Sequence, residues 1–448
     1  MRFFRFFVFF TYIIAILNNN MSGIEMFYGL ISMCLILLIT RVYPLSKHIG
    51  KYTVLLTFWI SLVFIPAFHL VVNLLGVEGA RGYIITDVDY QRILYFGNRV
   101  LLLTSLSWLI LGTILPKTFN NPRFVYNPVP VSYSFLRISL YFMFALSLFS
   151  LSIGLSRMGT TGVRLPFNLA GIITLLRVVF YPIFFAAIIE NFLIREKKIP
   201  KDVFILYILW AILETFVRLS KSAILSSFLI VALVLLLYYK PKLKTLAIYL
   251  IPIATSVLLL YPIVDIMRSN EGGRMGENFV SAFRESENDG IGANLILQPL
   301  NRTFMIPHMY AKDYSYLDQN HYFDFSKASA IVAIGGSARF QTFIIDEYPP
   351  GVPHSSGTTG LQDPLLFGGY GLCYIVIFFL IIIATAIDSI AHRRMITVYI
   401  ALILLLWSLC NEQNISSLID SVGIQYILVR LFAIIVAYFM NYRKKSFI

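Results

Sequence analysis

The feature that most constrains this chain is its succession of apolar segments, each close to the length that crosses a lipid bilayer as a helix. A crossing helix needs about 20 apolar residues, and about twelve segments approach that length. These segments are residues 3–17, 26–41, 52–75, 93–115, 133–155, 168–193, 203–219, 222–239, 245–266, 364–387, 395–411 and 421–440. Only 13% of the 448 residues are charged and 58% are hydrophobic, whereas soluble domains carry about 25% charged residues. The sequence therefore predicts an all-α polytopic membrane protein with about twelve transmembrane helices, and it excludes a soluble enzyme.

Two places leave the number of crossings open. The N-terminal stretch begins with basic residues and an apolar run, as a signal peptide does, but it continues into Asn18–Asn20. Because these are not the small residues of a cleavage site, we expect a first transmembrane helix here. Segments 203–219 and 222–239 meet at Leu219–Lys221. They form either two crossings or a reentrant pair, which would leave about ten full crossings.

The distribution of Lys and Arg predicts the orientation of the spans. If the N-terminus is cytoplasmic, most basic residues fall in connections on the cytoplasmic side. The short connections on the opposite side hold few of them: Arg81, Arg92, Arg157 and Arg164. Cytoplasmic connections of membrane proteins carry an excess of Lys and Arg, so we expect both termini to be cytoplasmic. The net charge of +13 is then a topology signal, and the sequence predicts no nucleic-acid partner.

This topology divides the chain into three parts. Residues 1–266 contain the first nine spans, residues 267–363 form one large loop on the outer, periplasmic side, and residues 364–448 contain the last three spans. The sequence carries no internal repeat, no glycine-rich phosphate loop and no metal-ligand spacing. It therefore predicts neither a cofactor nor a bound metal.

Ionisable residues inside the apolar segments are the strongest indication of a functional site. A charge at the bilayer centre costs about 2.5–3.5 kcal/mol on insertion scales, so such residues usually face a bundle interior or a wet cavity. Arg177 and Arg430 each lie about nine residues from the outer ends of their segments, roughly 13 Å deep. Glu214, Arg218 and Lys221 are spaced to share one helix face, on which Glu214 can neutralise Arg218.

These charges, together with Asp265 and Arg268, all lie towards the outer side of the predicted spans. They predict an outward-open cationic cavity for an anion. Within a membrane the obvious anion is a lipid phosphate or pyrophosphate bound by arginine forks. The alternative is that Arg218 and Lys221 merely extend to the outer headgroups.

The large loop carries aromatic residues interleaved with Asp, Asn and Gln between residues 304 and 325. Flat rings beside polar groups suit carbohydrate binding, and the alternative is that the rings pack the loop or lie at the membrane interface. The candidate sugar-binding residues are Tyr310, Tyr314, Tyr316 and Tyr322. Histidine is a suitable general base near neutral pH. The loop histidines are His308, His321 and His354.

Three stretches resemble Wzy-type polysaccharide repeat-unit (O-antigen) polymerases and the related O-antigen ligases. Pro349–Cys373 (PPGVPHSSGTTGLQDPLLFGGYGLC) resembles the Gly/Thr/Ser-rich turn that precedes an aromatic-glycine helix start in the polymerases. Leu219–Leu225 (LSKSAIL) resembles the Ser-Arg-Gly-Ala-Leu run of both families. Here Lys221 stands where arginine is usual, so the bidentate fork is missing at that position, and Arg218 can compensate for it. The outer turn Gly159–Arg164 also looks like these families.

The resemblance implies a metal-independent glycosyltransferase of the GT-C type in the bacterial inner membrane. Such enzymes join undecaprenyl-pyrophosphate-linked oligosaccharide repeat units into O-antigen or a similar surface polysaccharide, and their partners can include a chain-length regulator protein. Matched residue by residue, His354 corresponds to the candidate base. Arg268, Lys221 and Arg218 correspond to the pyrophosphate-binding cations, and His354 with Arg268 would be catalytic. Arg177 and Arg430 join the pyrophosphate-binding group because of their depth alone.

Other functions are alternatives to a polymerase. An O-antigen ligase would use the same cationic site with a different acceptor. A flippase or transporter of lipid-linked oligosaccharide would also explain buried arginines, but it would not explain one large external loop without internal repeats. A membrane acyltransferase would need a histidine inside a span, where His69 is the candidate.

Overall fold

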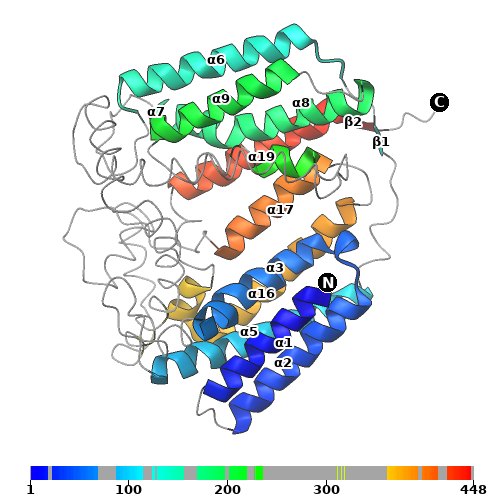
Figure 1. Ribbon diagram of the computed structural model, residues 1–448, viewed down its shortest axis with the longest axis vertical. Coiled ribbons are helices and arrows are strands. Elements are labelled where there is room, and N and C mark those ends of the chain that lie inside the picture. Colours follow the sequence, from blue (N-terminus) through cyan, green and yellow to red (C-terminus); the bar gives the residue numbers. More distant parts are fainter. Residues whose placement is uncertain are drawn as a thin grey trace. The chain divides into compact units, whose positions relative to one another are not determined.

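The computed structural model is built from apolar helices, and in the described part of the chain six of them are long and apolar enough to cross a membrane (Figure 1). They are Gly23–Val42, Ile49–Phe68, Val88–Leu111, Tyr133–Ser152, Leu169–Glu196 and Gly368–Ser389. Shorter apolar helices cover Phe4–Ile14, Ile396–Cys410 and Gln425–Asn441. The structure describes residues 2–18, 23–68, 87–114, 124–126, 129–155, 169–196, 201–218, 227, 229–235, 310, 314, 317, 361–391, 396–411 and 421–444.

The prediction of a helical, multi-pass membrane protein is confirmed. Every predicted span coincides with a described helix except two. Segment 245–266 lies outside the described residues, as does most of segment 222–239. The large loop 267–363 also lies outside them, apart from its last residues and three isolated positions. The described strands are two short segments, which an all-α prediction does not contain.

The chain divides into two compact units that interleave along the sequence. Unit 1 contains Met1–Pro122, Pro299–Arg394 and Leu402–Ile424. Unit 2 contains Arg123–Gln298, Met395–Ala401 and Gln425–Ile448. The three parts predicted from the sequence follow chain order, whereas each unit combines helices from the N-terminal and C-terminal parts of the chain.

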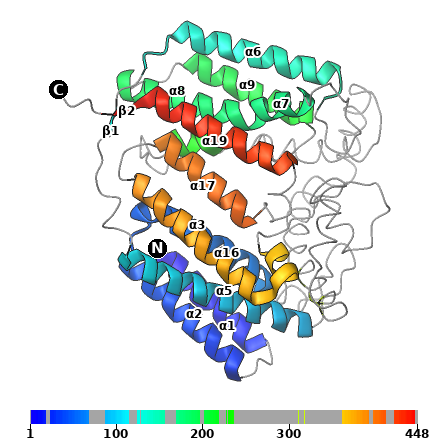
Figure 2. The ribbon, with the colours of Figure 1, turned by 180° about the vertical axis from the view of Figure 1, so that it is seen from behind.

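Unit 1 is assembled around one long helix. Its elements are α1(Arg2–Asn18), α2(Gly23–Val42), η1(Leu45–Lys47), α3(Ile49–Trp59), η2(Ile60–Phe64), α5(Asp87–Ile114) and α16(Gln362–Ala391). Helix α5 packs against α2, α3 and α16, and α16 also packs against α3 (Figures 1 and 2). The backbones approach closely at Gly97 of α5, because a Cβ atom there would lie 2.7 Å from the carbonyl oxygen of Leu62. Small residues allow such close helix contacts in membranes.

Unit 2 contains the remaining described elements. They are β1(Phe124–Tyr126), α6(Tyr133–Ser152), α7(Leu169–Leu175), η4(Leu176–Phe180), α8(Tyr181–Glu196), α9(Lys201–Arg218), α19(Ser421–Asn441) and β2(Tyr442–Lys444). Helix α6 packs against α9. Strands β1 and β2 pair antiparallel with Val125 opposite Arg443. Helix α17(Ile396–Asn411) begins in unit 2 and continues in unit 1.

Two buried carboxylates bind the first turns of helices that are distant in sequence. In unit 1, Asp388 accepts hydrogen bonds from the backbone N–H groups of Gly50 (2.7 Å) and Lys51 (3.3 Å) at the start of α3. In unit 2, Glu190 accepts hydrogen bonds from Ile396 (3.1 Å) and Thr397 (3.0 Å) at the start of α17. Both carboxylates satisfy N–H groups that have no partner within their own helix.

Candidate functional site

Arg177 lies in η4, a π-helical turn between α7 and α8 in unit 2. Pro182 follows this turn by two residues. A proline has no N–H to donate to the carbonyl four residues earlier, here that of Val178, and its ring clashes with that carbonyl. A widened turn relieves this conflict, and such turns occur frequently at functional sites. The local sequence therefore explains why the helix is widened at the buried arginine.

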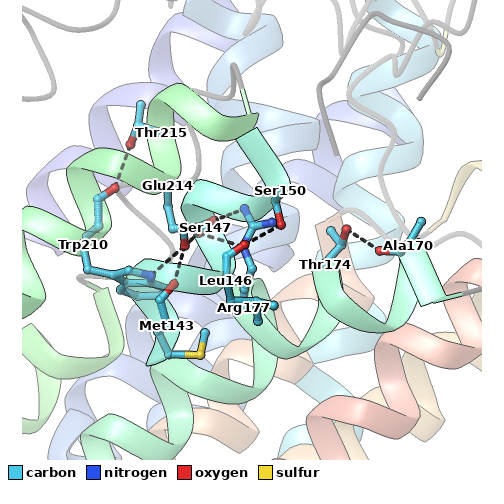
Figure 3. A network of polar contacts seen from close by, with 11 residues as sticks. Met143, Leu146, Ser147, Ser150, Ala170, Thr174, Arg177, Trp210, Glu214 and Thr215 are labelled. Carbon is cyan, nitrogen blue, oxygen red and sulfur yellow. Dashed lines mark hydrogen bonds and ion pairs between the residues drawn. The ribbon is translucent and has the colours of Figure 1, made fainter. Parts of the chain in front are cut away.

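The guanidinium group of Arg177 forms a fork with the carboxylate of Glu214 on α9 (Figure 3). Nε donates to Oε1 and Nη2 donates to Oε2, each at 2.8 Å. Arg177 is fully buried, and Glu214 is 2% exposed. A bidentate pair of this kind holds both side chains in one orientation.

Side chains of α6 and α9 complete the surroundings of Glu214 (Figure 3). The hydroxyl of Ser147 on α6 contacts Oε1 of Glu214. The indole Nε1 of Trp210 donates to the Ser147 hydroxyl at 3.1 Å. Both side chains are fully buried. The carboxylate therefore receives hydrogen bonds from two helices, which lowers the cost of burying its charge.

The Nη1 nitrogen of Arg177 takes no part in the pair with Glu214. It is buried and has no hydrogen-bond partner in the part of the chain that the structure describes. An unsatisfied buried donor costs about 1–3 kcal/mol, and more for a charged group. Arg177 can therefore donate to an additional acceptor while its pair with Glu214 stays intact.

Helix α19 lies beside η4 and carries Arg430. Phe180 of η4 stacks against Phe432 of α19, with ring centroids 5.8 Å apart. Each arginine precedes its phenylalanine by less than one helical turn, so the two arginines lie at a similar level along their helices. Arg430 is half-buried and lies over the ring of Tyr426, 4.9 Å from its centroid.

Arg218 adds a third cation in the same unit. It lies one turn beyond Glu214 on α9 and is half-buried. Its charge interacts with those of Glu214 and Arg177, and with Tyr426 of α19. It forms no hydrogen bond or ion pair with a described residue. Arg177, Arg218 and Arg430 are defined here as the arginine cluster: Arg177 holds the Glu214 carboxylate, the charge of Arg218 interacts with both, and Tyr426 lies beside both Arg218 and Arg430.

The charges of Glu214 and Arg218 interact, as the helix spacing predicted, but Glu214 forms its ion pair with Arg177. The i, i+4 spacing puts the two side chains on one face of α9, but the fork of Glu214 closes on Arg177 from another helix. Arg177 meets the carboxylate with two parallel N–H groups inside the bundle, where a charge pair is strongest. Arg218 therefore keeps its charge unneutralised by an ion pair within the described residues.

The structure describes two of the four candidate sugar-binding tyrosines. Both lie in unit 1 and are buried, Tyr310 fully and Tyr314 to within 6%. Tyr310 packs against Phe96 of α5, with ring centroids 5.8 Å apart. Packing of the loop, the alternative to sugar binding, accounts for these two rings. The other predicted residues lie outside the described residues: Lys221, Arg268, Tyr316, Tyr322, His308, His321 and His354.

Sequence reasoning missed two charged residues inside predicted spans. Glu190 of α8 is fully buried and binds the start of α17. Arg99 lies near the middle of α5 and is surrounded by tyrosine rings. Both could have been found from the sequence, because each is an ionisable residue inside an apolar segment.

No protein-family model, no curated protein sequence and no solved structure matches this chain. The chemistry of the cluster itself is that of anion binding. Guanidinium groups bind phosphate oxygens with paired N–H groups. Cations held by a folded bundle also stabilise negative charge that develops on a leaving group, without rearranging during the reaction.

Proposed function

We propose that the protein is a glycosyltransferase of the bacterial inner membrane that polymerises lipid-linked oligosaccharide repeat units. Its substrates would be oligosaccharides on undecaprenyl pyrophosphate, and its product would be O-antigen or a similar surface polysaccharide. The observation that carries this proposal is the arginine cluster, three cations on apolar helices of unit 2, with Glu214 as the carboxylate that Arg177 holds. With the predicted topology of about twelve spans and cytoplasmic termini, the cluster would face the periplasmic half of the membrane.

The chemistry that the arginine cluster supports is departure of pyrophosphate. Glycosyl transfer breaks the bond between the sugar and the pyrophosphate oxygen, and the acceptor hydroxyl forms the new bond to that carbon. Negative charge then develops on the leaving pyrophosphate. Arg218 and Arg430 can offset this charge, and the buried Nη1 of Arg177 can donate a further hydrogen bond. A base must also take the proton of the acceptor hydroxyl, and His354 is the proposed base.

A membrane position favours a lipid-linked substrate over a soluble one. The pyrophosphate of a polyprenyl lipid lies at the membrane surface, with its chain among the helices. Helix α19 presents several exposed apolar side chains close to the cluster in sequence. They include Leu428, Leu431, Phe432 and Ile435. A lipid chain can pack against such a surface while its head group reaches the arginines.

Arg218→Gln is the sharpest test of this proposal. Arg218 holds no ion pair among the described residues, so its loss should leave the fold intact and remove one cation from the site. We expect polymerisation of undecaprenyl-pyrophosphate-linked repeat units by the purified protein to fall by about 10²–10³, by analogy with the loss of one oxyanion-stabilising donor. The measurement is the rate at which glycan ladders form in nanodiscs.

Arg137→Gln is the matched control. Arg137 of α6 also carries a positive charge in unit 2, but it is exposed and paired with Asp202. Its replacement should leave the rate unchanged. Equal rates for Arg218→Gln and the wild type, with equal amounts of folded protein, would remove the arginine cluster from the mechanism.

A gene deletion distinguishes a polymerase from its alternatives. A strain without a polymerase should attach a single repeat unit to its lipid core, because ligation still proceeds. Loss of a ligase or a flippase should leave no repeat unit there. Full-length ladders in the deletion strain would contradict all three functions.

A further inference from the structure

Arg99 of α5 is held among aromatic rings from three helices of unit 1. Its Cζ atom lies 4.0 Å from the ring centroid of Tyr95, 5.3 Å from that of Tyr28 on α2, and 5.6 Å from that of Tyr370 on α16. It also hydrogen-bonds the Tyr95 hydroxyl and interacts with Tyr374 of α16. We refer to Arg99 with these four tyrosines as the tyrosine cage.

Among the described residues, the charge of Arg99 has no counterion. No ion pair among the described residues involves Arg99, although it lies well inside an apolar helix. Ring faces attract the flat sides of a guanidinium group by cation–π interaction. The ring faces accept no hydrogen bonds from the edge of the guanidinium group, where its five N–H donors lie. The Tyr95 and Tyr374 hydroxyls account for part of that edge.

The position of the tyrosine cage restricts what can occupy the remaining donors. Tyr28 is in the second turn of α2, and Tyr370 and Tyr374 are in the first half of α16. Arg99 is half-buried and therefore still accessible at this level. The Tyr314 hydroxyl lies 3.5 Å from the hydroxyl of Tyr370 in the cage. Burial raises the pKa of the Tyr314 phenol well above its ordinary value, so the Tyr314 hydroxyl stays protonated.

We propose that the tyrosine cage is a second anion site, which binds the phosphate group of a membrane lipid through Arg99. A phosphate oxygen pair matches the free edge of the guanidinium group. The rings of Tyr28 and Tyr370 lie near the first residues of the apolar spans Gly23–Val42 and Gly368–Ser389, and aromatic rings near the ends of spans are suited to the level of lipid headgroups. This site belongs to unit 1, whereas the arginine cluster belongs to unit 2, and it does not depend on the polymerase function.

Lipid retention by the purified full-length protein tests the proposal. The protein in detergent is exchanged into defined mixtures of phosphatidylglycerol, undecaprenyl pyrophosphate and uncharged diacylglycerol, and bound lipids are counted by native mass spectrometry. We expect Arg99→Gln to weaken retention of a phosphate-bearing lipid by about tenfold to a hundredfold, since hydrogen bonds between charged groups are lost. Arg99→Lys should retain it partly, because the charge remains without the fork.

The two lipid arms identify the source of the phosphate. Loss of phosphatidylglycerol in Arg99→Gln would mean a site for bulk lipid, and loss of undecaprenyl pyrophosphate would mean a site for a prenyl lipid. Arg137→Gln, which removes a charge already paired with Asp202, should change neither arm. Unchanged retention of both phosphate lipids in Arg99→Gln, or an equal loss of diacylglycerol, would overturn the proposal.

A second pair of variants keeps the test valid if Arg99→Gln does not fold. Tyr28→Phe keeps the ring that faces Arg99, whereas Tyr28→Leu removes it. We expect Tyr28→Phe to bind phosphate lipids like the wild type and Tyr28→Leu to bind them more weakly. Identical binding by the two variants and the wild type would show that the cage does not hold a ligand-binding arginine.

Discussion

At the scale of single residues, the pair between Arg177 and Glu214 determines what the other charges of unit 2 can do. Glu214 receives both N–H groups of the Arg177 fork and contacts Ser147. It has no ion pair with Arg218 among the described residues. A stable buried pair thus stands beside a cation that is free to meet a ligand. Variants of Arg177 and variants of Arg218 should consequently have different effects.

Removing one member of the pair should destabilise the protein strongly. Glu214→Leu leaves the Arg177 charge buried without its partner, and Arg177→Met does the same to Glu214. We expect each single variant to lose about 3–5 kcal/mol of unfolding free energy. The double variant should lose less than either one, because no unpaired charge remains. Thermal unfolding in detergent micelles measures all three, and strictly additive losses would contradict the coupling.

The sequence predicted which charged residues belong to this site better than it predicted which of them pair with one another. Arg177, Glu214, Arg218 and Arg430 stand out because ionisable residues are costly in apolar segments. Spacing along one helix identified Arg218 as the neighbour of Glu214, but it holds no information about a partner on another helix. Arg177 reaches Glu214 through tertiary packing, which no spacing rule describes.

At the scale of elements, the two π-helical segments have the same sequence context. Segment η2 is followed two residues later by Pro66, and η4 is followed two residues later by Pro182. In both places the proline removes one backbone hydrogen bond, and the helix continues through a wider turn. The apolar pattern predicted both helices, because their length and hydrophobicity dominate. It did not predict the widened turns, which depend on how each helix relieves its proline.

The close contact between η2 and α5 makes Gly97 sensitive to substitution. A Cβ atom at this position would lie 2.7 Å from the Leu62 carbonyl oxygen and 2.9 Å from the Leu62 Cβ. We expect Gly97→Ala to cost about 1–3 kcal/mol, because the helices must move apart. Gly371→Ala in α16 is the control, since no atom lies within 4 Å of its added Cβ. Equal melting temperatures for the two variants would contradict this close packing.

We expect the carboxylate of Asp388 to contribute about as much to the free energy of unfolding as a helix N-cap does. Asp388→Ala leaves the N–H of Gly50 without its acceptor, and caps of this kind contribute about 1 kcal/mol. Asp388→Asn keeps an acceptor oxygen and should lose less. Both variants also lose the charge beside Lys51, whose Nζ lies 3.9 Å from Asp388. Thermal unfolding measures the stability of both variants. An equal loss of stability in the two would show that the charge of Asp388, and not its hydrogen bonds to the helix start, stabilises the protein.

At the scale of the whole molecule, the length of the apolar segments predicts the membrane-spanning helices. It does not predict how these helices are divided between the two units. Backbone groups in a bilayer need partners within their own helix, so apolar length predicts helices almost directly. Which helices share a unit depends on contacts between distant parts of the chain, such as α16 with α3. A sequence read from end to end cannot reveal these contacts.

The predicted orientation can be tested with reporters along the chain. A fluorescent protein fused after Ile448 should fluoresce, because it would fold in the cytoplasm. Alkaline phosphatase fused within residues 267–363 should be active, because it would fold outside. The physical reason is the excess of Lys and Arg in the connections assigned to the inside. The reverse pattern of activities would overturn the orientation and move the arginine cluster to the other half of the membrane.

The pairing of β1 with β2 has a consequence for how the protein is made. Residues 124–126 pair with residues 442–444, which follow much later in the chain and are therefore synthesised later. In the same way, the N–H group of Gly50 has its acceptor only after Asp388 has been synthesised, and the carboxylate of Glu190 binds α17 only after the start of that helix has been synthesised. A ribosome that stalls before α16, α17 and β2 would therefore leave early helices inserted with unsatisfied ends in both units. The early helices therefore stay recognisable as incompletely folded to cellular quality control until these later partners have been made.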